Sequence, residues 1–381
     1  MRTRIDAARL VCVLMMMYVH VPNGHTSSIL SDPGAYTRFD HWLESILIEG
    51  PGRASAALLS VVSGYLAATT LLQGRLSVTR LYWRRFCSVV LPMFCWALLT
   101  CLVYLALGHS DALLLTPDSH WLDKLNKLLF LTSAPEGPTL HLGFLRDLFV
   151  CVLLSPALLW LLQRMPLLTM TGLLAVYLFH HSGQLVIILR PLVIFGFAIG
   201  IVLALRRTTL QILDPYWAWF LSLTGVFAVF IIWADAGMFL NVQEYLAVQG
   251  VSFKETILYP LCRLFGSLAI WTMLSTVHMK TLLRFTSRYS NYVFAAFCAH
   301  FLILTLVFNG IWLPLLGGRD AYIYLLWFIA APAVSLLLTI CFVNLVSMLN
   351  SQLASLITGG RLSLSAGSGF PVRPIISGAS T

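Results

Sequence analysis

The first apolar segment of the chain carries two ionisable side chains whose spacing places them on one side of a helix. Arg9 and His20 are eleven residues apart, which at about 100° per residue is within about 20° of three whole turns and separates them by roughly 16 Å along the axis. Asp6 precedes Arg9 by three residues and can pair with it. Histidine suits proton transfer because its pKa lies near neutrality. The segment therefore predicts an anchored cation at one end and a base deep in the helix.

Each of these residues also has a purely structural interpretation. Arg9 alone would be read as a topology-setting arginine that reaches for the membrane surface. His20 could join two helices by a hydrogen bond. For His20 we favour a functional role, because ionisable groups inside apolar helices usually mark a pathway or a site. Its shared face with Arg9 strengthens that interpretation.

Other polar side chains occur later in the chain at similar depths. His300 lies about ten residues into an apolar segment, where a role in the site and a helix–helix hydrogen bond are equally compatible with the pattern. Glu136, His141 and Arg146 form a group near one predicted surface and are candidates to bind a polar substrate. With Asp147 they could equally form a salt-bridge cluster at the rim. His180 and His181 have no visible third ligand, so we expect no metal site.

Composition identifies the elements that must position these residues. The 381 residues are 59% hydrophobic and only 10% charged, whereas soluble domains average about 25% charged residues. Ten segments approach the length of about 20 mostly apolar residues that a membrane-spanning helix needs. They cover residues 8–22, 54–73, 86–107, 143–163, 167–182, 185–205, 216–234, 256–277, 291–313 and 322–348. We therefore predict an all-α integral membrane protein with about ten transmembrane helices.

The distribution of charge predicts the orientation of these helices. If the N-terminus is cytoplasmic, the inner segments hold most of the basic residues but only two of the 15 acids, Asp6 and Asp214. Both termini are then cytoplasmic. The formal net charge of +9 accordingly favours topology and contact with anionic lipid over nucleic-acid binding. Residues 1–350 form one predicted transmembrane domain, and residues 351–381, rich in Gly, Ser and Pro from Gly359, form a predicted disordered cytoplasmic tail.

An ordered set of motifs resembles a known family. The Arg9-to-His20 spacing with Asp6 before it, Ser63-Gly64-Tyr65 at the end of an apolar helix, and Tyr82 to Pro92 with its paired arginines are similar to motifs of the membrane acyltransferase family called type three. His141 to Leu145 and Ser290 to His300 resemble two later motifs, in the same order. The resemblance covers about residues 4–350.

The resemblance implies an activity and a set of roles. These enzymes are bacterial O-acyltransferases that modify cell-surface and secreted carbohydrates from an acyl-coenzyme A, most simply acetyl-coenzyme A. His20 would then act in catalysis with Asp6, Arg9 and His300. Donor phosphates suit arginine forks, and the candidate donor-binding residues are Arg9, Arg80, Arg84, Arg85 and Ser63. Ser63 and Gly64 could instead only allow two helices to approach closely.

Two positions depart from the family pattern. The family usually carries another arginine three residues after the arginine pair, where this chain has Ser88. Gly143 replaces a usual tryptophan. These differences affect the expected details of donor binding more than the class of reaction.

The sequence thus predicts an acyl-coenzyme A-dependent O-acyltransferase (an acetyltransferase) of the bacterial inner membrane. Its expected acceptor is a hydroxyl of an exopolysaccharide, a surface glycan or its lipid-linked precursor. Another acyl group, such as succinyl, or a small-molecule acceptor remains open, as does the choice between direct transfer and an acylated histidine. The alternative class is a transporter or flippase with a polar intramembrane pathway, although no internal repeat is visible.

Overall fold

The computed structural model describes residues 2–22, 39–74, 76–108, 139–180, 189–207, 210–235, 252–276, 289–316 and 321–362. In these residues the regular structure is helical, without a β-strand, which confirms the all-α fold class. The helices are α1 (Arg2–Tyr18), α2 (Phe39–Leu47), η2 (Ile48–Gly52), α3 (Arg53–Leu72), α4 (Val78–Arg85), η3 (Phe86–Val90), α5 (Leu91–Ala106), η5 (Leu140–Leu142), α7 (Gly143–Arg164), α8 (Pro166–Phe179), α9 (Pro191–Leu205), η6 (Leu210–Tyr216), α10 (Trp217–Asp235), η7 (Lys254–Leu258), α12 (Tyr259–Met273), α14 (Val293–Val307), η8 (Phe308–Trp312), α15 (Leu313–Leu316), α16 (Ala321–Leu349) and α17 (Ser351–Ile357).

Seven helices of the described chain are long and apolar enough to cross a membrane. They are His41–Leu72, Val78–Ala106, Leu140–Arg164, Leu210–Asp235, Lys254–Met273, Val293–Leu315 and Ile323–Leu349. Three further predicted spans correspond to the shorter helices α1, α8 and α9, of 17, 14 and 15 residues. Ten spans and two cytoplasmic termini therefore stay predictions, whereas a multi-pass helical protein is observed.

The outer faces of the bundle are apolar. Leu167 on α8, Trp219 on α10 and Leu337 on α16 are 78%, 70% and 61% exposed, and many other large apolar side chains are exposed beside them. Water would disfavour such a surface, but lipid tails match it. The exposed apolar surface agrees with the membrane location expected from composition.

Helix ends differ from the predicted segments where proline acts. Residue 21 precedes Pro22, and a residue before proline avoids the helical region, so α1 ends at Tyr18 instead of residue 22. The predicted span at 54–73 starts earlier, because α2, the π-helical turn η2 and α3 are continuous from Phe39. Pro51 lies inside η2, where it removes a backbone donor and favours the wider turn.

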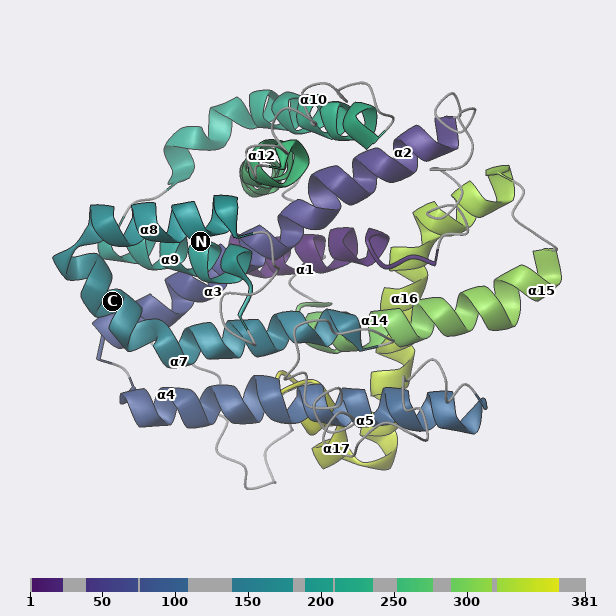
Figure 1. Cartoon of the computed structure of the whole chain (residues 1–381). Coiled ribbons are helices and arrows are strands. Elements are labelled where there is room, and N and C mark those ends of the chain that lie inside the picture. Colours follow the sequence, from purple (N-terminus) through teal and green to yellow (C-terminus); the bar gives the residue numbers. More distant parts are fainter. Residues whose placement is uncertain are drawn as a thin grey trace, which may run out of the picture.

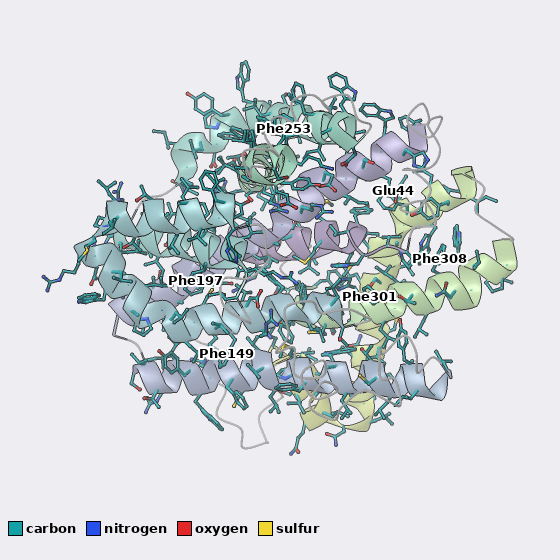
Figure 2. The ribbon with its side chains drawn as sticks, viewed as in Figure 1. Glu44, Phe149, Phe197, Phe253, Phe301 and Phe308 are labelled. Atoms are coloured by element: carbon teal, nitrogen blue, oxygen red, sulfur yellow. The ribbon has the colours of Figure 1, made fainter. Side chains whose placement is uncertain are left out.

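Helices α1, α7 and α14 form the centre of the bundle (Figure 1), with α10 and α12 along one side of the view and α4 and α5 along the other. Close packing holds this arrangement. Helices α3 and α9 approach so closely that a Cβ atom on Gly64 would overlap the backbone of Phe197, a fully buried residue labelled in Figure 2. Gly64 thus makes the small-residue contact considered above.

The start of α1 is fixed by an ion pair. Arg4 donates from Nη1 and Nη2 to Asp214 at 3.0 and 2.6 Å, donates to the Trp271 carbonyl, and lies over the Trp271 ring at 4.4 Å. These contacts join α1 to η6 and α12.

The C-terminal segment is ordered further than predicted. Residues Ser351–Ile357 form α17, and Asn350 caps it by accepting hydrogen bonds from the Gln352 and Leu353 amides at 2.9 and 3.0 Å. The predicted disordered tail therefore cannot begin at residue 351, because residues 351–362 pack against the bundle. Residues 363–381 lie outside the described residues.

Candidate active site

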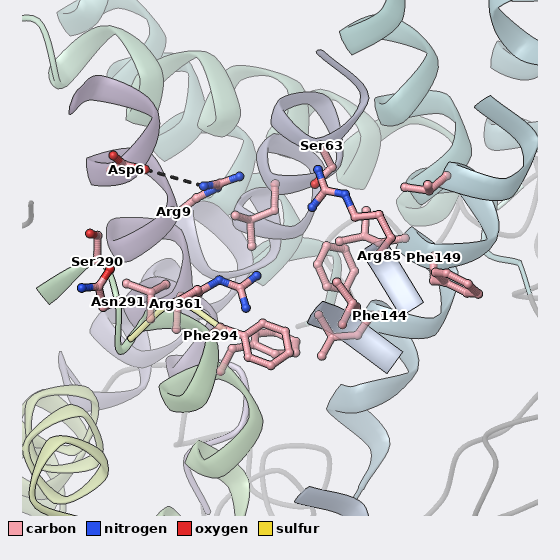
Figure 3. A pocket seen from close by; sticks show the side chains of 18 residues that line it. Asp6, Arg9, Ser63, Arg85, Phe144, Phe149, Ser290, Asn291, Phe294 and Arg361 are labelled. Carbon is pink, nitrogen blue, oxygen red and sulfur yellow. Dashed lines mark ion pairs between the residues drawn. The ribbon is translucent and has the colours of Figure 1, made fainter. Parts of the chain in front are cut away.

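A cavity of about 270 Å³ lies between α1, α3, η3, α7 and α14. Its apolar wall comes mostly from α7 and α14, and its polar lining comes from α1, α3, α4, the turn before α14 and the segment after α17 (Figure 3). The polar residues that line it are Asp6, Arg9, Ser63, Arg85, Ser290, Asn291 and Arg361. Of the predicted donor-binding residues, the structure places Arg9, Arg85 and Ser63 here.

Positive charge exceeds negative charge in this cavity. Within the described part of the chain, three guanidinium groups, from Arg9, Arg85 and Arg361, and one carboxylate, that of Asp6, line the cavity. Figure 3 shows these side chains around one space. Asp6 lies 3.6 Å from Arg9 Nη1, as the three-residue spacing predicts. The excess of cations fits an anionic ligand, since guanidinium forks bind phosphate and carboxylate well.

Arg80 and Arg84 do not line the cavity. Arg80 is exposed in the first turn of α4, where its backbone amide donates to the capping Ser77 hydroxyl at 3.4 Å. Arg84 directly precedes Arg85 in the last turn of α4. The side chains of neighbouring helix residues point about 100° apart. Only one arginine of the pair is therefore directed into the cavity.

Three histidines converge next to the cavity. The ring centroid of His20 lies 5.3 Å from that of His300 and 6.2 Å from that of His141, and the rings of His141 and His300 are 4.5 Å apart. We call these three residues the histidine cluster. Phe297 packs against it, and so does Phe301, which is labelled in Figure 2. His141, expected near the outer surface as a substrate-binding residue, lies in the same cluster as the two predicted catalytic histidines.

Backbone carbonyls select the tautomers of two of these rings. His141 Nε2 lies 2.9 Å from the Cys298 carbonyl oxygen, and His300 Nδ1 lies 2.6 Å from the Phe297 carbonyl oxygen. A carbonyl only accepts, so each of these nitrogens carries the hydrogen. His141 Nδ1 and His300 Nε2 then each carry a lone pair. Within the described residues neither atom has a hydrogen-bond partner. Two buried acceptors beside His20 could receive a proton or a substrate hydroxyl.

His20 reaches the cluster from a turn that follows α1. Its backbone amide donates to the Met17 carbonyl at 2.9 Å, so helical phase alone does not determine its direction. Arg9 and His20 nevertheless both face α14, because Arg9 lines the cavity with Phe294 and Phe297 and His20 contacts His300.

The cavity and the histidine cluster share a wall. Phe297 lines the cavity and lies 5.9 Å from the His141 ring and 5.7 Å from the His300 ring. One side of α14 carries three residues at three-residue intervals, Phe294, Phe297 and His300. They span roughly 9 Å along the helix axis. A long thin ligand with its anion at the arginines would point its other end towards the histidines.

The two described members of the predicted substrate-binding group have different neighbours: His141 lies in the histidine cluster, whereas Arg146 pairs with Asp147. Arg146 donates from Nε and Nη2 to Asp147 Oδ1 at 2.8 and 2.6 Å, and both side chains are buried. Arg190 Nε lies 3.8 Å from Asp147 Oδ2. The salt-bridge alternative is thus observed, inside the bundle instead of at a rim. Glu136 lies outside the described residues.

Two further residues near the site have weak sequence signals. Arg53, the first residue of α3, pairs with Glu49 at 2.8 Å, and its positive charge acts on His20. The four-residue spacing of Glu49 and Arg53 could have identified this pair. Arg361 had no such signal, because nothing local distinguishes it from Arg373, the other basic residue of the predicted tail.

In the part of the chain that the structure describes, no three His, Cys, Asp or Glu side chains are arranged to hold a metal ion.

Comparison with known proteins adds independent information. Residues 2–346 match the family model described as an acyltransferase domain. The chain is also 29% identical over 375 residues to the succinoglycan biosynthesis protein ExoH of Rhizobium meliloti strain 1021, covering 94% of this chain and 92% of that protein. No solved structure is significantly similar to the chain.

Proposed function

This chain belongs to the acyltransferase family whose model it matches over residues 2–346, and from that premise we propose that it moves an acyl group from a cytosolic acyl-coenzyme A to a carbohydrate hydroxyl. It is a multi-pass membrane acyltransferase. The observation that carries the finer proposal is the arginine-lined cavity that shares Phe297 with the histidine cluster. A phosphate-bearing donor and a proton acceptor would meet there.

The donor is held at the arginine end. Arg9 and Arg85 bind its phosphates, and Ser63 can donate a hydroxyl hydrogen bond from the same cavity. Arg80 and Arg84 are placed to attract the donor from the predicted cytoplasmic side instead of contacting it in the cavity. Asp6 orients Arg9 through the 3.6 Å ion pair. The pantetheine arm extends along α14 and brings the thioester to the histidines.

Transfer proceeds by general base catalysis. A nitrogen of His20 accepts the proton of the acceptor hydroxyl, while the hydroxyl oxygen attacks the carbonyl carbon of the thioester. The carbon–sulfur bond breaks, and the departing thiolate takes a proton to give free coenzyme A. His300 and His141 assist through their unpaired ring nitrogens, which can hold the hydroxyl or relay the proton.

The acceptor is proposed to be a polysaccharide or its lipid-linked precursor at the periplasmic side of a bacterial inner membrane. The relative from Rhizobium meliloti is named for succinoglycan biosynthesis, and succinoglycan is a polysaccharide. Glu136 and Arg146 remain candidates for acceptor binding, with Arg146 acting together with Asp147. The acyl group is taken to be acetyl, the simplest cytosolic thioester, with succinyl as the main alternative.

Purified protein in nanodiscs tests this function. We expect acetyl-coenzyme A and a surface-glycan acceptor to give free thiol and an acylated sugar, detected by mass spectrometry. Succinyl-coenzyme A in a parallel reaction identifies the acyl group. Thiol release that is equal in wild type and His20→Ala would exclude the proposed catalytic role, and no acylation with any acyl-coenzyme A would exclude the donor.

A further inference from the structure

The chain after α17 turns back onto the bundle. Trp96 Nε1 donates to the Ile357 carbonyl at 2.9 Å, which attaches the end of α17 to α5. Gly359 and Gly360 then have φ values of +67° and +73°, a left-handed conformation that side chains disfavour. A Cβ on Gly359 would overlap the Ser88 carbonyl oxygen. This turn requires glycine and delivers the next residue, Arg361, to the cavity.

Arg361 is held in place from one side. Its Nη1 donates to the Thr358 carbonyl at 3.0 Å and to the Ser88 carbonyl at 3.3 Å. The guanidinium lies 4.2 Å over the Phe294 ring, itself part of the cavity wall. Nη1 is the donor of both hydrogen bonds. Within the described residues, the N–H groups of Nε and Nη2 are therefore available to another acceptor.

The surroundings of Arg361 oppose its charge. Burial, together with the positive charges of Arg9 and Arg85, lowers the pKa of Arg361. Among the residues that the structure describes, Asp6 is the one carboxylate that lines the cavity, and it lies beside Arg9. Three cations around one space are stabilised when an anion with more than one charge binds between them.

We propose that Arg361 is a donor-binding residue that completes a three-arginine clamp, with Arg9 and Arg85, for the phosphate groups of the acyl donor. The identity of the donor rests on the proposed function, whereas the clamp for a multiply charged phosphate rests on the cavity. Arg361 lies beyond residue 346, where the family match ends, so the C-terminal segment of this chain adds to the site of the domain. It contacts Ser88, the position where the chain lacks the arginine of the resembled motif.

Binding measurements on the full chain test the clamp. In nanodiscs of phosphatidylcholine, the dissociation constants of coenzyme A and of pantetheine, which lacks its phosphates, are compared for wild type and Arg361→Ala. We expect Arg361→Ala to weaken coenzyme A binding by about tenfold or more, the equivalent of one charge-assisted hydrogen bond, and to leave pantetheine binding unchanged. Arg361→Lys keeps the charge but lacks the guanidinium fork, so its dissociation constant for coenzyme A should lie between those of wild type and Arg361→Ala.

Arg164→Ala is the matched control, because Arg164 is an exposed arginine on the same predicted face that does not line the cavity. Coenzyme A binding to Arg361→Ala within twofold of wild type would overturn the proposal. If Arg361→Ala does not fold, Arg361→Lys decides between the same outcomes.

Two further arms separate the possible sources of phosphate. If wild type binds no coenzyme A, the proposed donor is wrong, and thermal stabilisation by inorganic diphosphate then tests the clamp: loss of stabilisation in Arg361→Ala supports it, and equal stabilisation overturns it. In nanodiscs with phosphatidylglycerol, a rise in Tm that depends on Arg361 while coenzyme A binding does not would mark a lipid headgroup site and overturn the donor assignment.

Discussion

The arginine-lined cavity and the histidine cluster are two ends of one region, and they handle charge in opposite ways. The cavity holds three permanent cations, and the Arg9 side chain there is still 38% exposed. The histidine cluster is packed between aromatic rings, with His141 and His300 4% and 0% exposed. In both His141 and His300, one ring nitrogen donates to a backbone carbonyl and the other has no hydrogen-bond partner among the described residues.

The difference indicates that the cavity binds the donor and that the histidine cluster performs the chemical step. A permanent charge is costly far from water unless it is paired, so the cations lie where an anionic ligand can enter. Histidine can stay neutral at rest and accept a proton only while the reaction needs it. Substitutions in the cavity should therefore change donor binding, and substitutions in the cluster should change the chemical step.

The largest expected effect is in the cluster. His20→Ala should lower kcat for acyl transfer by about 10²- to 10⁴-fold, because it removes the general base, while the KM for the donor changes little. Steady-state thiol release measures both constants. His180→Ala, at the end of α8 and outside the cluster, serves as the control, and an equal loss in both variants would contradict the assignment.

A buried ion pair tests whether the interior accepts charge only when it is paired. Asp147→Asn should lower the free energy of unfolding by about 3–5 kcal/mol, because Arg146 loses its buried counter-ion. Thermal or denaturant unfolding in detergent measures this change. Asp235→Asn removes a carboxylate that lies 2.6 Å from Lys254 but is 41% exposed, and should cost about 1 kcal/mol or less. Similar losses in the two variants would remove the distinction.

The cavity, where three arginines and one carboxylate meet among the described residues, should behave in the reverse manner. Arg85→Met should raise the KM for the acyl donor by about 10- to 100-fold, the equivalent of 1.5–3 kcal/mol. The unliganded protein should keep or increase its Tm, because repulsion among the three arginines decreases. A large fall in Tm together with an unchanged KM would show that Arg85 is structural.

The smallest effect concerns an arginine outside the cavity. Arg80→Ala should change the donor KM by a few-fold at most, since an exposed charge contributes about 1 kcal/mol or less, and the remaining effect should disappear at high salt. KM measured across a salt series tests this. A salt-independent loss comparable to that of Arg85→Met would place Arg80 in direct contact with the donor.

The membrane fold and the outline of the site could be predicted from local patterns. Apolar segments identify the helices because a spanning helix must be apolar along its whole length. The spacing of Asp6, Arg9 and His20 identified one end of the cavity and one member of the cluster. Helix ends were less certain, since Pro22 ends α1 early and η2 joins α2 to α3.

Three-dimensional packing decided the rest. The sequence predicts His141 near an outer surface, but the Cys298 carbonyl and the approach of η5 to α14 place it beside His300. Arg84 and Arg85 are adjacent and chemically identical, and only the rotation of α4 directs Arg85 into the cavity.

By itself, the sequence determined that this protein lies in a membrane and that Asp6, Arg9 and His20 are the ionisable residues of its first apolar segment, because those properties follow from residue type and spacing. Tertiary structure alone decided which distant side chains join them. Arg361 reaches Arg9 and Arg85 only because α17 docks on α5 and two glycines adopt left-handed conformations. Contacts between residues hundreds of positions apart depend on the packing of whole helices, which no local pattern encodes.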